Sequence, residues 1–187
     1  MKNIGLLILL LALFASCKKE DSAPTQFLEN SNLEKYAGSG QPWYSEGNGL
    51  GFAAGWNAED YSSPSHSLKI VRTQVPDPLD TEFWYWYQTI TREIPVGKAL
   101  TLSANIKGVD LNGEGLAIAI RGDSGSTQLQ FATTQYTMTI NGSFDWTNYT
   151  LDLPAVESGV TTLWVFLIYL PNTTGIAYFD DVELTVK

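Results

Sequence analysis

The feature that most restricts the fold of this chain is a series of short strand-like runs separated by Gly, Pro, Asn and Asp. From Ser67 onward these runs are rich in β-branched and aromatic residues, and none shows the spacing of an amphipathic helix. The runs are SLKIVRTQV, FWYWYQTITREI, ALTLSANIKG, GLAIAIRG, QLQFATTQYTMTI, WTNYTLDL, TLWVFLIYL and IAYFDDVELTV. Such a succession predicts an all-β fold, an antiparallel β-sandwich.

The residues before Ser67 give a weaker signal. Residues 40–66 are rich in Gly and aromatic residues but lack alternation, so we expect this segment to be mostly loop. Long loops in a compact domain are commonly functional or disordered, and the aromatic content argues against disorder. Trp43 and Tyr44 are therefore candidates either for ligand contact or for closing one end of the sandwich.

The N-terminal residues have the features of a targeting segment. Residues 1–16 contain a lysine near the start, an apolar run and small residues before Cys17, which predicts a signal peptide. The run FASC resembles the lipobox of bacterial lipoproteins, and this resemblance implies that Cys17 carries a lipid anchor. Cys17 is the chain's one cysteine, so an internal disulfide is excluded. Residues 17–27 predict a flexible tether and residues 28–187 a single domain.

The start of the tether gives an expectation about location and partners. The run KKED resembles the signal that sends Bacteroidetes lipoproteins to the outer leaflet of the outer membrane, and DSA resembles the O-glycosylation tripeptide of that phylum. These resemblances imply a cell-surface protein of the outer membrane, attached through its lipid only. With 11 basic against 20 acidic residues, the chain is a poor nucleic-acid binder.

The run FWYWYQ sets five consecutive aromatic residues in one predicted strand. A strand sends alternate side chains to opposite faces, so Phe83, Tyr85 and Tyr87 lie on one side. Trp84 and Trp86 lie on the other. One set can fill the core, whereas the other needs a second packing layer, a partner, or a ligand that stacks on aromatic faces.

Several runs follow one another as in the carbohydrate-binding modules of families 4, 9 and 22, which the chain resembles from about residue 30 to its end. The runs are NSNLE, PW, HSLKI, the aromatic strand ending in Gln88, VGKALTLSANIKG, FDWTNYTLDL and TGIAYFDDVEL. These modules are jelly-roll sandwiches of the galactose-binding-like type. The resemblance implies that Trp84 stacks on a sugar ring, with Trp86 and Gln88 on the same face.

The same resemblance implies further site residues. Trp43 or Tyr44 would join the sugar-binding face from the preceding loop, and the tyrosines of the aromatic strand would then face the core. The family commonly holds a structural calcium ion away from the sugar site. The corresponding residues here are Glu34 and Asp180, whose carboxylate oxygens suit Ca²⁺.

Few residues of this chain suit catalysis. The one histidine is His66, and Cys17 is assigned to the lipid, so Ser-His-Asp, Cys-His and histidine-rich metal chemistry fit poorly. We therefore expect a non-catalytic, glycan-binding lipoprotein that holds polysaccharide or oligosaccharide near glycan-uptake or degradation proteins. The alternatives are a structural or protein-interaction module on the same fold and a glycoside hydrolase, which would need two facing carboxylates.

Overall fold

The structure is a computed structural model that describes residues 26–35, 41–73, 77, 79 and 81–187. Cys17, the predicted signal peptide and most of the predicted tether lie outside these residues. The described part contains nine strands and no helix, and hence no helix that could cross a membrane. The strands are β1 (Tyr44–Asn48), β2 (Phe52–Asn57), β3 (Ser67–Arg72), β4 (Phe83–Ile90), β5 (Leu100–Ser124), β6 (Thr127–Thr133), β7 (Ile140–Leu153), β8 (Thr162–Tyr169) and β9 (Thr174–Val186).

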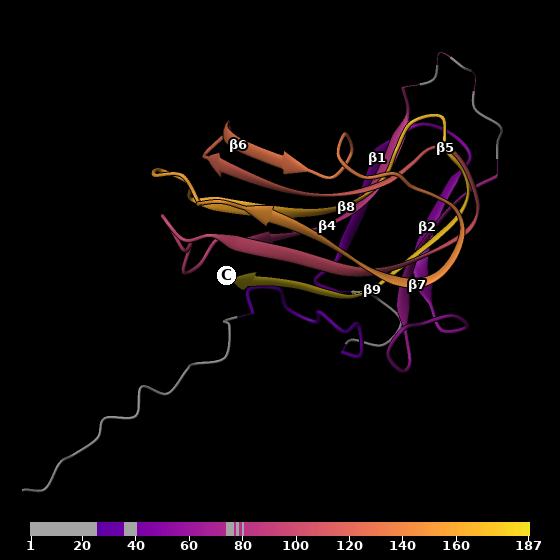
Figure 1. Ribbon diagram of the computed structural model, residues 1–187, viewed down its shortest axis with the longest axis horizontal. Coiled ribbons are helices and arrows are strands. Elements are labelled where there is room, and N and C mark those ends of the chain that lie inside the picture. The colour runs from indigo at the N-terminus through magenta and orange to yellow at the C-terminus, as the bar shows by residue number, and fades with distance from the viewer. Residues whose placement is uncertain (1–25, 36–40, 74–76, 78, 80) are drawn as a thin grey trace, which may run out of the picture.

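The strands form two layers that share β5 (Figure 1). The first layer has the order β1, β4, β8, the second part of β5, and β6. The second layer has the order β2, β3, β9, the first part of β5, and β7. All pairings between these strands are antiparallel. The predicted all-β antiparallel sandwich is therefore confirmed.

The apolar core lies between the layers because alternate residues of each strand face inward. Its largest fully buried side chains include Trp43, Leu68, Ile70, Leu100, Leu102, Ile106, Leu116, Ile118, Ile120, Tyr169 and Phe179. These residues come from the loop before β1 and from β3, β5, β8 and β9. Strand β8 lies in the middle of the first layer, between β4 and β5, and its continuous apolar sequence is typical of a strand covered on both faces.

Strand β5 contains two of the predicted strand runs, ALTLSANIKG and GLAIAIRG, which we expected to be separate strands. Instead of turning back, the chain passes from the second layer to the first, with Gly113 and Gly115 at φ 107° and 84°. A Cβ atom on Gly113 would collide with the carbonyl of Asn172, and one on Gly115 with the carbonyl of Ile140. Glycine is required at this crossing because both its positive φ and the close backbone approach exclude a side chain.

The expectation of a loop before Ser67 is wrong in part, because β1 and β2 lie there. β1 does alternate, but its inward residues are Ser45 and Gly47 rather than apolar side chains. A Cβ atom on Gly47 would lie 2.8 Å from the ring of Trp84. The small residues of β1 thus leave room for the large side chains of β4, and this hides the strand from a hydrophobic pattern.

Candidate functional site

Strand β4 faces the opposite way from our expectation. Trp86 and Gln88 are 5% and 4% exposed and lie on the core side, and Trp84 packs partly buried against the same core. Phe83 and Tyr85, which alternate with them, point to the outer face of the first layer. The predicted sugar-facing orientation of Trp84, Trp86 and Gln88 is therefore wrong.

Polar partners inside the sandwich account for the burial of the two tryptophans. The Nε1–H of Trp86 donates to the carbonyl oxygen of Lys69 at 3.3 Å, which links β4 to β3 in the other layer. The Nε1–H of Trp84 donates to the hydroxyl of Ser45, and its ring stacks on Phe52 with centroids 5.5 Å apart. A partner for the indole N–H removes the cost of burying a polar group, so both rings can contribute their large apolar area to the core.

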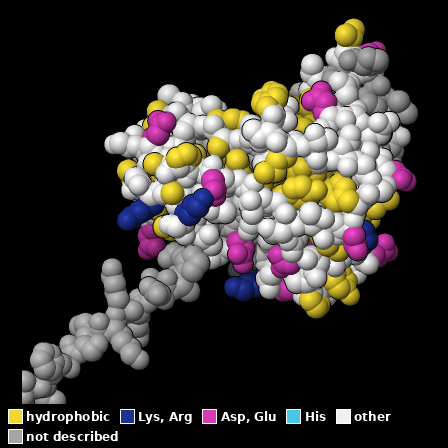
Figure 2. Space-filling model, viewed as in Figure 1, with side chains coloured by type: hydrophobic (Ala, Val, Ile, Leu, Met, Phe, Trp, Pro, Cys, Tyr) yellow, Lys and Arg dark blue, Asp and Glu magenta, His cyan; other side chains and the backbone are white. Residues whose placement is uncertain are grey.

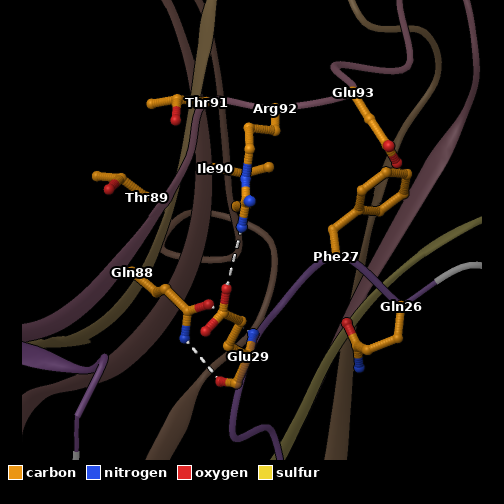
Figure 3. A pocket seen from close by; sticks show the side chains of 9 residues that line it. All are labelled: Gln26, Phe27, Glu29, Gln88, Thr89, Ile90, Thr91, Arg92 and Glu93. Atoms are coloured by element: carbon orange, nitrogen blue, oxygen red, sulfur yellow. Dashed lines mark hydrogen bonds and ion pairs between the residues drawn. The ribbon is translucent and has the colours of Figure 1, made fainter.

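The side chain of Gln88 holds the N-terminal segment against β4. Its Oε1 accepts the backbone N–H of Glu29 at 2.7 Å, and its Nε2 donates to the carbonyl of the same residue at 2.9 Å (Figure 3). Arg92 adds an exposed ion pair to Glu29 at 3.4 Å. Both polar ends of the amide are thus used within the protein, so Gln88 has a structural role here.

A cavity of about 400 Å³ lies beside this contact. It is lined by Gln26, Phe27, Glu29, Gln88, Thr89, Ile90, Thr91, Arg92 and Glu93 (Figure 3). Its charged side chains are Glu29, Arg92 and Glu93, of which Glu29 and Arg92 are exposed and paired with each other. The cavity therefore offers a polar hollow without aromatic rings placed for stacking, apart from Phe27 at its edge.

Trp43 and Tyr44 are adjacent in sequence but differ in position. Trp43 is 1% exposed, and its Nε1–H donates to the carbonyl of Asn30 at 3.3 Å. It closes the sandwich, so its expected place on a ligand face is wrong. Tyr44 is 47% exposed and lies on the outer face of the first layer, with its ring centroid 5.7 Å from that of Tyr87.

The outer face of the first layer carries a continuous group of aromatic rings, which we call the aromatic platform. It consists of Tyr44 on β1, Phe83, Tyr85 and Tyr87 on β4, and Trp164 and Phe166 on β8. The centroid of Tyr87 lies 5.5 Å from that of Trp164, and that of Tyr85 lies 5.4 Å from that of Phe166. Neighbouring strands thus place their rings in contact across the sheet.

Sequence reasoning did not assign the platform to this face. The signal was present in the alternation of Phe83, Tyr85 and Tyr87, but the resemblance favoured the other parity. Burial raises the pKa of the Tyr85 hydroxyl, and the negative charge of Glu46 raises it further. The hydroxyl therefore remains protonated at neutral pH and is able to donate a hydrogen bond from the platform.

Part of the outer face of the second layer is covered by the chain's own loop between β2 and β3. The carboxylate of Asp60 in this loop forms an ion pair with Nζ of Lys107 at 2.9 Å and accepts a hydrogen bond from the Nε1–H of Trp146 at 3.2 Å. Ser62 and Ser63 donate their backbone N–H groups to Asp180 at 2.8 and 2.9 Å. These contacts hold the loop over part of β5, β7 and β9.

The two expected calcium ligands contact the same loop at different points. Asp180 is fully buried, and burial raises its pKa to about 6 although backbone N–H donors oppose the shift. Glu34 accepts the N–H of His66 at 3.1 Å and the hydroxyl of Ser65 at 3.2 Å. Among the described residues no three His, Cys, Asp or Glu side chains gather as a metal site.

Two carboxylates supply at most about four of the six to eight oxygen atoms that Ca²⁺ takes. Backbone carbonyl oxygens or water would have to complete a site at Glu34 and Asp180. The donor chemistry of the pair suits calcium, but both carboxylates accept hydrogen bonds from N–H and O–H groups of the loop, and Asp180 also accepts the N–H of Asp181. The calcium ion therefore stays a prediction.

The neighbourhood of His66 contains a serine and a carboxylate but lacks the order of a catalytic triad. The hydroxyl of Ser65 lies 2.9 Å from Nδ1 of His66, and Glu34 Oε2 lies 3.8 Å from the same nitrogen. A histidine that relays a proton has the nucleophile at one ring nitrogen and the carboxylate at the other. Here both groups approach one nitrogen, so this cluster does not form such a relay.

Charged side chains on the visible face of the molecule are dispersed (Figure 2). Among the described residues in that view, Lys and Arg lie at separate positions, with hydrophobic and acidic side chains between them. Nucleic-acid binders usually gather basic residues along one surface. The visible face therefore lacks the continuous basic surface, built from described residues, that would follow a phosphate backbone.

No family model matches the chain, and no curated protein sequence matches it. Solved structures do. The enzymatically active domain of bacteriophage CBA120 tailspike protein 4 matches 87% of this chain with a TM-score of 0.64 at 15% identity, and the chain spans 21% of that protein. TmCBM61, solved with β-1,4-galactotriose, matches 87% of this chain and 99% of its own length, with a TM-score of 0.56 at 15% identity.

The CBM22-1 xylan-binding domain of Paenibacillus barcinonensis Xyn10C gives a similar match. It covers 88% of this chain and 96% of its own length, with a TM-score of 0.54 at 13% identity. At these identities the likeness concerns the fold. The chain therefore has the antiparallel jelly-roll β-sandwich fold of the carbohydrate-binding modules that its sequence resembles.

Proposed function

We propose that this protein is a non-catalytic glycan-binding domain and that it binds polysaccharide or oligosaccharide on the aromatic platform. The observation that carries the proposal is the outward group of contacting aromatic rings on the first layer. Pyranose rings present patches of C–H that stack on flat aromatic faces, and the hydroxyl groups of the sugar accept or donate hydrogen bonds to polar side chains beside those faces. The platform provides both kinds of contact.

The energetics of the platform also favour a ligand. Apolar surface left in water forgoes roughly 25 cal/mol per Å², and contiguous exposed apolar patches commonly mark binding sites. Tyr44 and Phe83 are 47% and 37% exposed although they belong to one aromatic group. Two structural neighbours, TmCBM61 with β-1,4-galactotriose and a xylan-binding CBM22-1, add support from the same fold.

A protein-interaction module is the second candidate function. Tyr, Trp and Arg are the residues most enriched at protein-binding hot spots, and the platform contains Tyr85, Trp164 and, beside them, Arg121. A protein partner would need the same exposed rings. The two functions separate by ligand, since the glycan hypothesis requires binding to purified carbohydrate without any other protein.

The proposed setting is the outer membrane, with the domain lipid-anchored at Cys17 and facing outward, where it holds glycan near uptake or degradation proteins. This part rests on the lipobox-like FASC and on the tether that begins KKED. A structural calcium ion at Glu34 and Asp180 would join the N-terminal segment to β9 without contacting the platform.

The test is carbohydrate binding by the mature chain made without its lipid through a Cys17→Ser substitution. We expect binding on a glycan array, confirmed by calorimetry, and a loss of at least about tenfold in affinity for Tyr87→Ala and Trp164→Ala, which corresponds to about 1.4 kcal/mol. Tyr136→Ala is the matched control, since Tyr136 is 86% exposed and lies outside the platform. Glycan binding that survives both platform substitutions would refute the proposed site.

A further inference from the structure

The charged residues on the strands of the first layer are few and lie on the platform side. They are Glu46 on β1 and Arg121 and Asp123 on β5, while β4, β6 and β8 carry none. Arg121 is thus the only basic residue on these described strands. The position of Arg121 therefore affects the affinity of the platform for a charged ligand.

The guanidinium of Arg121 lies over two rings of the platform. Its guanidinium carbon is 4.8 Å from the ring centroid of Trp164 and 5.4 Å from that of Phe166. Its register partner on β8 is Trp164, and on β6 it is Phe131, which is 48% exposed. The guanidinium therefore forms part of the surface that a ligand on the platform would touch.

Asp123 holds this guanidinium by one edge. Its Oδ2 accepts Nε–H of Arg121 at 3.1 Å and lies 2.9 Å from Nη2. The side chain of Asp123 is 9% exposed, whereas that of Arg121 is 31% exposed. The carboxylate thus lies beneath the surface while the remaining N–H groups of the guanidinium stay available to a ligand.

The carboxylate is not fully satisfied by this contact. Asp123 Oδ1 is buried without a hydrogen-bond partner among the described residues, and so is Nε1 of the neighbouring Trp164. An unpaired buried polar atom costs about 1 to 3 kcal/mol, and a charged one more. Stability alone is therefore a weak reason for an aspartate at this position.

We propose that Asp123 makes the platform selective for uncharged glycans by cancelling the charge of Arg121. The inference rests on the proposed glycan binding and adds the ligand class and the residue that sets it. With Asp123 in place, Arg121 donates to sugar hydroxyls as a stacked, oriented group but has no net charge to offer a uronate or sulfate. The other charged residue on these strands, Glu46, acts on Tyr85 of the platform, is negative and repels such ligands.

The test compares each neutral glycan with a form of the same backbone that carries carboxylates. The pairs are galactan and C6-oxidised galactan, β-1,3/1,4-glucan and C6-oxidised β-glucan, and unsubstituted xylan and glucuronoxylan. The protein is the mature chain carrying Cys17→Ser. We expect the neutral member of the bound pair to bind more tightly, and the weaker affinity for the charged member to rise with ionic strength as repulsion is screened.

Asp123→Asn keeps an oxygen that accepts Nε–H of Arg121 and removes the charge. We expect the ratio of charged-form to neutral-form affinity to rise about tenfold, which one unit charge at a partly buried site readily supplies. The double variant Arg121→Gln with Asp123→Asn should lose this gain. Asp152→Asn on β7, exposed in the other layer, changes the net charge equally and should leave the ratio unchanged.

Each outcome has a distinct meaning. If the unmutated protein binds no member of any pair, the proposed function falls and this inference with it. If it binds a neutral glycan but Asp123→Asn leaves the ratio unchanged, the inference alone falls. Should Asp123→Asn fail to fold, the salt dependence of the unmutated protein decides, because affinity for a charged glycan that falls with added salt would reveal an uncancelled positive charge on the platform.

Discussion

Replacing Trp86 by Ala tests the orientation of β4, on which the platform depends. The indole is 5% exposed and donates a hydrogen bond to the carbonyl of Lys69 in the opposite layer. Removing a buried aromatic side chain costs about 3 to 5 kcal/mol, and the abandoned carbonyl adds about 1 kcal/mol. For a domain of this length, the melting temperature should fall by roughly 10 °C or more.

Tyr87→Ala in the same strand is the matched comparison. Tyr87 is half-buried on the outer face, so its removal should cost only about 1 kcal/mol of unfolding free energy while weakening glycan binding. Both variants are measured by urea unfolding and thermal melts, with equal denaturant slopes as the check for a two-state comparison. A large loss of stability in Tyr87→Ala beside a near-normal Trp86→Ala would refute the orientation.

The remaining predictions concern the ends of the domain. Gln88→Ala should lower the free energy of unfolding by about 2 kcal/mol, since two hydrogen bonds to Glu29 disappear, yet leave glycan affinity unchanged in calorimetry. If calcium binds Glu34 and Asp180, EGTA should lower the melting temperature. The lost stability is about 2.7 kcal/mol when free metal is at a hundredfold excess over Kd, and identical melts with and without EGTA would refute the calcium site. Burial raises the pKa of Asp180 from 3.8 to about 6, so the folded state holds this proton more tightly than the unfolded state. The contribution of Asp180 to the free energy of unfolding is therefore greatest below about pH 4 and is lost as pH rises through about 6. Urea titrations in EGTA should show this pH dependence, and Asp180→Asn should flatten it. Cys17→Ala should release the protein from membranes, and protease added to intact cells should digest the unmutated form, whereas full protection would contradict surface exposure.

The sequence predicted the strands from Ser67 onward well because their apolar runs and turn residues are local signals. The sequence did not predict β1, because its inward residues, Ser45 and Gly47, are small and give no apolar alternation. Small residues are needed there because the indole rings of β4 pack against them. Such complementarity joins residues about 40 positions apart in sequence and leaves no local pattern.

The parity of β4 was undecidable from the sequence for a related reason. Both alternating sets are aromatic, so hydrophobicity could not assign a face. The outcome depends on hydrogen-bond partners for the indole nitrogens, Ser45 for Trp84 and the Lys69 carbonyl for Trp86, which only the folded layers bring close. Polar partners in the interior, rather than apolar content, decide which aromatic set is buried.

The contact between Gln88 and Glu29 has a mechanical consequence. A polymer held at Tyr87 and pulled by flow exerts tension on β4, and the next residue along that strand grips the segment leading toward the predicted anchor. A pull from the predicted anchor would reach the domain first at Gln26 and Phe27, which are hydrogen-bonded to Thr185 and Leu184 of β9, and only then at Glu29. The load would therefore be divided between β9 in the second layer and β4 in the first layer.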